Sequence, residues 1–160
     1  MIKYKWIREQ VEHGINIRQV YGIVFDKNGN ILLRVDDNKY KLTGGKPEAY
    51  DKNYSETLKR EYIEELNVEI EDVQYLGYLL VEEDNEKYAQ VRMIAKIKSI
   101  GPIKPDADNG KIYKRFMSKQ ENVKNYLEYE DIAGNEMIDD AIKIGNQNYK
   151  FNFTDKEYYI

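Results

Sequence analysis

The strongest constraint on this sequence is one helical segment that carries apolar residues on one side and three glutamates on another. The apolar positions recur every four residues, at Tyr54, Leu58, Tyr62 and Leu66, which is the spacing of an amphipathic helix. At about 100° per residue, Glu61, Glu64 and Glu65 fall within an arc of about 100°, separate from the apolar face. The sequence therefore predicts a helix with three carboxylates that point the same way.

Both ends of this helix carry residues that favour helix termini. Asn53 is followed three positions later by Glu56, which is the spacing of a capping box. Asn67 belongs to the few residue types that adopt the left-handed conformation at a helix end. We therefore predict a helix over residues 54–66.

The three clustered glutamates suit a divalent cation. Like charges at these spacings cost about 0.2–0.5 kcal/mol per exposed pair, and more in a cleft, so a bound cation would remove this repulsion. Carboxylate oxygens on a rigid helix are typical ligands of Mg²⁺, for which Mn²⁺ is the natural substitute. Without its surroundings, however, a Glu-x-x-Glu-Glu pattern is more often a solvated acidic face.

Short apolar runs before the helix predict strands. Residues 18–25 and 31–35 are joined by Asp-Lys-Asn-Gly-Asn, a hairpin signal in which Gly29 supplies the positive φ of a tight turn. After a second turn, the strand at 40–43 ends at the glycine pair Gly44 and Gly45.

Strands and helices alternate after the acidic helix. We expect strands over 73–81 and 88–97, a loop over 101–111, and a strand over 112–117. Ser118 and Glu121 have the spacing of a capping box for a short helix, and residues 135–144 fit a last helix that Gly145 stops. This order predicts a fold of the α/β (α+β) class, with a mixed sheet and helices on its faces.

Length and composition exclude several classes of protein. The 160 residues, of which 41% are apolar, fit one domain over 1–160, with a short N-terminal extension (about 1–16) and a C-terminal tail (about 146–160). The absence of cysteine excludes disulfides and thiolate sites and favours a cytoplasmic protein. No run approaches the roughly 18 apolar residues of a membrane span. The formal charge is −4, and residues of both signs are interspersed along the chain. No basic face is concentrated enough for nucleic acid, so we expect no membrane or nucleic-acid polymer as partner.

The segment from the glycine pair to the end of the helix resembles the Nudix box. The residues that match its pattern are Gly45, Arg60, Glu61, Tyr62, Glu64, Glu65 and Val68. Three positions depart from it: Asn67 stands where the family has glycine, Thr43 where many members have proline, and Asp51 is nearest to the family's loop glutamate. The interval from Asp51 to Arg60 is one residue longer than in the family pattern, which makes the loop 46–53 irregular.

This resemblance implies a fold, an activity and a set of site residues. The fold would be the Nudix-like α/β/α sandwich with a central mixed sheet. The activity would be Mg²⁺-dependent hydrolysis of the pyrophosphate bond in a nucleoside diphosphate-linked small molecule. Glu61, Glu64 and Glu65 would be metal ligands, together with the Gly44 carbonyl. Arg60 would orient Glu61 or Asp51 by a charge-assisted hydrogen bond, whereas its spacing alone equally fits an ion pair with Glu56.

Other roles stay open at the level of sequence. Lys46 is a candidate phosphate contact, although a solvated loop lysine fits as well. The general base varies in this family, and Asp106, Asp108, Glu82 and Glu83 are the candidates. His13, the only histidine, fits a surface position better than a base. The oligomeric state is also open, with a homodimer as one alternative.

Three other functions compete with hydrolysis. The irregular loop motivates a Nudix-fold domain that has lost catalysis and senses a nucleotide. A prenyl diphosphate isomerase would use a cysteine that this chain lacks. A protein-interaction domain would carry the acidic helix incidentally. No motif for a coenzyme A pyrophosphatase or an ADP-ribose hydrolase is visible, so the sequence leaves the nucleoside diphosphate derivative open.

Overall fold

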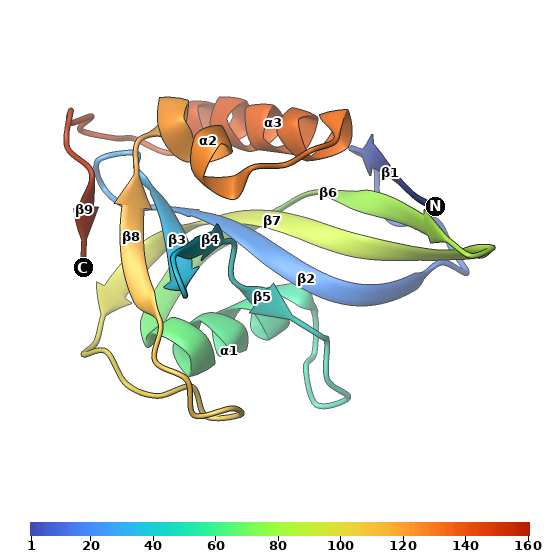
Figure 1. The fold of residues 1–160 in the computed structure, drawn as a ribbon, viewed down its shortest axis with the longest axis horizontal. Coiled ribbons are helices and arrows are strands. Elements are labelled where there is room, and N and C mark those ends of the chain that lie inside the picture. Colours follow the sequence, from blue (N-terminus) through green and yellow to red (C-terminus); the bar gives the residue numbers. More distant parts are fainter.

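A mixed sheet of nine strands forms the centre of the protein in the computed structural model, which describes residues 1–160 (Figure 1). The strands are β1 (Ile2–Ile7), β2 (Asn16–Phe25), β3 (Ile31–Asp36), β4 (Lys39–Lys41), β5 (Gly44–Gly45), β6 (Val68–Glu83), β7 (Glu86–Ile100), β8 (Lys114–Ser118) and β9 (Tyr158–Tyr159). Their order is β1-β6-β7-β2-β3-β8-β9, while β4 pairs with β3 and β5 with β2. Strands β2 and β7 are parallel, and the other pairs are antiparallel.

Helices cover both faces of this sheet. Helix α1 (Tyr54–Leu66) lies on one face, whereas α2 (Val123–Leu127) and α3 (Ile132–Asn148) lie on the other (Figure 1). A 3-10 turn at Gln120–Asn122 precedes α2. Each face has its own apolar cluster, one of 17 buried residues beneath α3 and one of 15 beneath α1. The predicted class, a mixed sheet with helices on its faces, is confirmed.

Helix α1 begins and ends at the predicted residues. The side chain of Asn53 accepts a hydrogen bond from the Glu56 backbone N–H at 2.9 Å, which satisfies one of the free donors of the first turn. Asn67 ends the helix in the left-handed conformation with φ 53° and ψ 44°. Its side chain also donates to the Pro102 carbonyl at 3.0 Å. The departure from glycine at this position therefore preserves the helix end and adds a contact to the following loop.

The predicted turn between β2 and β3 is present. Gly29 has φ 76°, and the Asp26 carboxylate accepts from the N–H groups of Asn28 and Asn30 at 2.8 and 2.9 Å. Only Phe25 and Ile31 pair directly across the hairpin. The two strands then take different neighbours, because β2 pairs with β7 and β3 pairs with β8.

Strands β6 and β7 are longer than the predicted 73–81 and 88–97. Their register shifts at several places, including the interval from Glu71 to Gln74, where Asp72 has φ 51°. Such bulges interrupt the alternation of inward and outward side chains, which hides the first part of β6 in a search for period two. Strand β6 in fact begins at Val68, directly after α1.

Two predictions for the C-terminal part were wrong. Ser118 lies in β8 and donates its hydroxyl hydrogen to the Lys119 carbonyl, so it does not cap a helix. Helix α3 starts at Ile132, where Asp131 caps it, and continues through Gly145 to Asn148. Gly145 does not stop the helix because it lies against the Phe25 ring, where a Cβ would approach Cζ to 2.6 Å.

Both ends of the chain contribute strands to the sheet. The N-terminal extension contains β1, which pairs with β6 from Ile2↔Glu83 to Ile7↔Tyr78. The C-terminal segment closes on β8 through β9. None of the helices combines the length and apolar character needed to cross a membrane.

We expect Gly145→Ala to lower the free energy of unfolding by up to about 2 kcal/mol, because overpacking against Phe25 costs about 1–3 kcal/mol and the gain in helix propensity returns only about 1 kcal/mol. Urea unfolding measures the change. Gln147→Ala, at an exposed position of the same helix, is the matched control and should change little. A G145A variant more stable than the original protein would contradict this account of the α3–β2 contact.

Candidate active site

The predicted acidic face of α1 is only partly open to solvent. The side chains of Glu61, Glu65 and Glu64 are 12%, 10% and 21% exposed. On the apolar face, Leu58 and Tyr62 are fully buried, as the spacing predicts. Burial of two carboxylates argues against a solvated acidic face, because water no longer stabilises their charge.

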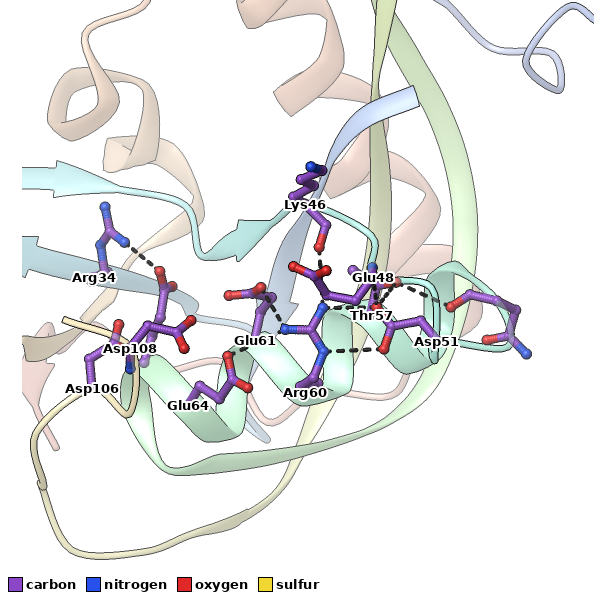
Figure 2. Close-up of polar contacts among 12 residues, drawn as sticks. Arg34, Lys46, Glu48, Asp51, Thr57, Arg60, Glu61, Glu64, Asp106 and Asp108 are labelled. Atoms are coloured by element: carbon purple, nitrogen blue, oxygen red, sulfur yellow. Dashed lines mark hydrogen bonds and ion pairs between the residues drawn. The ribbon is translucent and has the colours of Figure 1, made fainter. Parts of the chain in front are cut away.

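Arg60 joins the helix carboxylates to the preceding loop (Figure 2). Its Nη1 donates to Glu61 Oε1 at 2.9 Å and to Glu64 Oε2 at 3.3 Å. Its Nε and Nη2 donate to the two oxygens of Asp51 at 3.1 and 2.8 Å, and Nη2 also donates to the Lys46 carbonyl at 3.2 Å. This pattern is a bidentate arginine–carboxylate pair. The predicted alternative, an ion pair with Glu56, does not form.

Asp51 organises the loop that precedes α1. Besides Arg60, its carboxylate accepts from the Glu48 N–H and the Thr57 hydroxyl, each at 2.9 Å. The Arg60 guanidinium, and to a smaller extent these two donors, hold the pKa of Asp51 well below its usual range. The loop thus closes on Arg60 although it is one residue longer than the family pattern.

Arg34 is a site residue that the sequence analysis missed. It lies on β3, and its Nη1 donates to Glu65 Oε1 at 2.8 Å, while its guanidinium stacks over the Tyr113 ring at 4.6 Å. The contact joins residues 31 positions apart, so no local pattern announces it. A single arginine in the run Ile31-Leu-Leu-Arg-Val is the only signal that could have drawn attention to it.

The glycine pair allows the sheet to approach the acidic helix closely. A Cβ on Gly45 would lie 2.4 Å from Glu61 Oε1, and one on Gly44 would lie 2.0 Å from the Val20 carbonyl. Any side chain at Gly45 would therefore displace the Glu61 carboxylate. Strand β5 therefore passes directly against the Glu61 carboxylate of α1.

Two of the four candidate bases lie at this site. Asp106 and Asp108 come from the loop after β7 and lie beside Glu64 and Glu61 (Figure 2). Asp106 is buried, and its Oδ1 accepts from the Asp108 N–H at 2.8 Å, whereas Asp108 is exposed.

The other two candidates lie at the end of the β6–β7 hairpin. Glu83 pairs with Ile2 of β1, and Glu82 forms an ion pair with Lys87. Neither has a contact with α1. His13 is exposed in the segment between β1 and β2, as predicted. The side chain of Lys46 is exposed and extends away from Arg60 (Figure 2).

Burial and mutual repulsion disfavour the charged form of the helix glutamates. Burial is the main cause that raises the pKa of Glu61 to about 7, with Glu64 and Asp108 adding to it and Arg60 opposing it. Burial likewise raises the pKa of Glu65 to about 7, with Arg34 opposing and Glu61 and Asp106 adding. The pKa of Glu64 is raised for the same primary reason. The site therefore lacks positive charge for the number of carboxylates that it holds.

The donor set has the chemistry of a site for a hard divalent cation. All side chains that could coordinate a metal here are carboxylates. One of their oxygens, Glu65 Oε2, is buried and has no hydrogen-bond partner. In this arrangement, however, no three acidic side chains surround one point closely enough to hold an ion. Arg60 and Arg34 instead contact Glu61, Glu64 and Glu65, so a bound cation would compete with these guanidinium groups.

Comparisons with known proteins agree on one family. The model of the NUDIX domain matches residues 16–134. Among solved structures, the fold resembles the pyrophosphohydrolase BsRppH of Bacillus subtilis, with a TM-score of 0.69, 18% identity, and coverage of 89% of this chain and 91% of that chain. A NUDIX hydrolase from Nitrosomonas europaea has a TM-score of 0.60 and 15% identity. A MutT protein from Bacillus halodurans has a TM-score of 0.56 and 18% identity. Each match covers 89% of this chain and 97% of the other chain. No curated protein matches the sequence. The predicted α/β/α sandwich is thereby confirmed.

We expect Asp51→Asn to lower the free energy of unfolding at pH 7 by about 1–3 kcal/mol, because it leaves Arg60 without its bidentate partner. The folded-state pKa of Asp51 is depressed, so the contribution of its carboxylate is present above the unfolded pKa of about 3.9 and is lost as the pH falls through the folded value. Urea unfolding from pH 7 to pH 3 should show the deficit of D51N shrink below about pH 4. The control is Glu48→Gln, since the Glu48 side chain has no partner in the loop. A deficit that does not depend on pH would contradict the ion-pair account.

Proposed function

We propose that this chain, which belongs to the Nudix family, is a Mg²⁺-dependent hydrolase that cleaves the pyrophosphate bond of a nucleoside diphosphate-linked small molecule. The observation that carries the proposal is the buried carboxylate face of α1, where Glu61 and Glu65 remain in contact with arginines and have a raised pKa. A fold that only needed a helix at this position would fill it with apolar residues, since buried carboxylates cost stability.

Glu61, Glu64 and Glu65, with the Gly44 carbonyl, would hold the cation, and Mn²⁺ would substitute for Mg²⁺. When bound, the metal supplies positive charge that bridges carboxylates and phosphates and lowers the pKa of a coordinated water. Support for this set comes from the unpaired, buried Glu65 Oε2 and from the contact of Gly45 with the Glu61 carboxylate.

Arg60 and Arg34 would position the ligands rather than contact the substrate. Arg60 is fixed by the Asp51 carboxylate and the Lys46 carbonyl, so the guanidinium group stays in place when Glu61 and Glu64 turn toward a cation. Arg34 fixes Glu65 from the opposite end of the carboxylate row. Lys46, whose amine is exposed, would contact a phosphate of the substrate.

Asp108 would act as the general base. It is exposed and lies beside Glu61 and Glu64, whereas Asp106 uses Oδ1 to hold the turn of its own loop. Glu82 and Glu83 lie too far along the β6–β7 hairpin to reach a water molecule near α1.

A nucleotide sensor without catalysis is the second candidate. It is favoured by one observation: no three acidic side chains converge on a point, because the arginines contact them. A screen of nucleoside diphosphate derivatives with and without Mg²⁺ separates the two functions. Phosphate release supports the hydrolase, and saturable binding without release supports the sensor.

The double variant Glu64→Gln with Glu65→Gln should abolish Mg²⁺ binding and reduce hydrolysis by about 1,000-fold or more, since metal activation contributes several kcal/mol. Isothermal titration with Mg²⁺ and a phosphate-release assay measure the two effects. Glu56→Gln, in the exposed first turn of the same helix, is the matched control and should leave both unchanged. Unaltered Mg²⁺ affinity in the double variant would exclude these carboxylates as the site.

Asp108→Asn should lower kcat by about 100-fold or more, which is the usual contribution of a general base, while Mg²⁺ binding persists. The control is Glu82→Gln, the candidate that the structure places at the hairpin end, and its kcat should match that of the original protein. If kcat and its pH profile are the same in D108N, the base lies elsewhere.

A further inference from the structure

A second feature of the molecule is a cavity of about 680 Å³ between β2, β7, the β3–β4 hairpin and the end of α2. This volume lies within the range of small-molecule sites, about 300–1,000 Å³. Its lining combines aromatic rings with a few polar groups. The residues on which the inference rests are Tyr21, Gln90, Arg92, Tyr126, Glu128 and Tyr129.

Arg92 is a buried cation without an anionic partner. Its residue is 4% exposed, yet no carboxylate stabilises it, and burial lowers its pKa. Its Nε has no hydrogen-bond partner. Its Nη atoms make long contacts of 3.5 and 3.3 Å with Gln90 on the same strand, and the Tyr129 hydroxyl is its other polar neighbour. An unpaired guanidinium costs stability unless a ligand completes its hydrogen bonds.

A second buried arginine shows what a purely structural guanidinium looks like here. Arg115 is 5% exposed, and its donors reach the carbonyls of Leu66, Gly101 and Ile160 at 2.9, 2.8 and 3.2 Å. The protein thus satisfies one buried arginine with its own backbone and leaves the other, which lines a cavity, with a free donor.

This cavity adjoins the acidic helix through one aromatic residue. The Tyr21 ring lies 4.6 Å from the Arg92 guanidinium, and Tyr21 pairs with Gly44 in the sheet. A Cβ on Gly44 would approach Tyr21 Cδ1 to 2.7 Å. One ligand can therefore place phosphates at Gly44 and the α1 carboxylates while another part of it enters the cavity.

The walls favour a planar ring over a second anion. Rings of Tyr21, Tyr126 and Tyr129 offer apolar and stacking area, which is worth about 1–3 kcal/mol per stacked base. Glu128 lines the same cavity and would repel a phosphate or carboxylate group while accepting hydrogen bonds from ring N–H groups. The donors of an arginine match O6 and N7 of guanine, and a carboxylate matches the donor edge of the same base.

We propose that this cavity binds the guanine base of the substrate, with Arg92 donating to the acceptor edge and Glu128 accepting from the donor edge. The proposal rests on the proposed hydrolase function for the position of the phosphates, and it adds the class of base that the site selects. Adenine keeps the N7 acceptor but offers an amino donor where guanine has O6, so it would leave one of the two Arg92 donors unsatisfied.

Calorimetric titration in the presence of EDTA tests base selection on the unaltered protein. The probes are guanosine, adenosine and inorganic phosphate, of which the first two carry no phosphate that could bind at the acidic helix. Guanosine should bind saturably, and adenosine about tenfold or more weakly. Equal affinities for the two nucleosides, or a response to inorganic phosphate alone, would overturn the proposal.

Variants separate ligand recognition from a structural role. Arg92→Met should lower guanosine affinity about tenfold or more and leave the Tm unchanged or raised, because a buried unpaired charge is removed. The matched control is Arg115→Met, which should lower the Tm through three unpaired carbonyls and leave the guanosine affinity per folded molecule unchanged. A lower Tm for R92M with unaltered guanosine affinity would assign Arg92 to the core alone.

The double variant E64Q/E65Q distinguishes failure of this proposal from failure of the proposed hydrolase function. Loss of hydrolysis with guanosine binding retained supports two linked but separable sites. Mg²⁺-dependent hydrolysis that ignores the base, without guanosine binding, overturns the guanine proposal and leaves the hydrolase function intact. If the unaltered protein binds guanosine but hydrolyses no nucleotide in the presence of Mg²⁺, the result supports the cavity and overturns the hydrolase.

Discussion

The interaction on which the site depends is the contact of Arg60 with carboxylates on both of its sides. Asp51 accepts hydrogen bonds from one edge of the guanidinium, and Glu61 and Glu64 accept hydrogen bonds from Nη1 on the other edge. Without this charge, the acidic face of α1 would repel itself inside a region that excludes water. Arg34 does the same for Glu65. The two arginines let the chain fold with carboxylates in place before any cation is present, and a divalent ion would then compete with donors that are already near the ligands.

The extra residue in the loop 46–53 does not disrupt the contact between the loop acid and Arg60. A family pattern fixes the interval between an acid and an arginine, but the physical requirement is that the two side chains meet. Asp51 meets Arg60 because the Glu48 N–H and the Thr57 hydroxyl orient its carboxylate. The departure at Asn67 also has a benefit. Its side chain and backbone hold Pro102 and Gly101, which begin the loop that carries Asp108, so the end of α1 positions a loop that a glycine could not hold by a side chain.

Local information predicts the parts of the protein that are locally determined. The bounds of α1 follow from Asn53, Asn67 and the four-residue apolar spacing, and the family pattern finds Arg60 with the helix glutamates. Bulges near Asp72 hide the start of β6, and a ring from β2 against Gly145 overrides a helix-stop signal. Arg34 and Arg92 were missed for a different reason: each stands between apolar residues of a strand, and its meaning depends on its surroundings in the folded chain. For Arg92, the informative fact is the absence of an anionic partner, which only a structure can show.

If the proposed hydrolase function holds, the arrangement of these arginines also connects substrate choice with hydrolysis. Phosphates require cations at α1, whereas the cavity beside Tyr21 already contains an uncompensated cation in Arg92. A nucleotide with its phosphates at the α1 carboxylates and its base in the cavity would have to pass across β5. There, Gly44 leaves no room for a side chain between Tyr21 and the backbone. The distance from ring to phosphate is then set by the rigid pairing of β5 with β2 rather than by a mobile loop. Base contacts in the cavity would therefore act on catalysis through the position of the phosphates, so that a base that fits poorly would cost turnover as well as affinity.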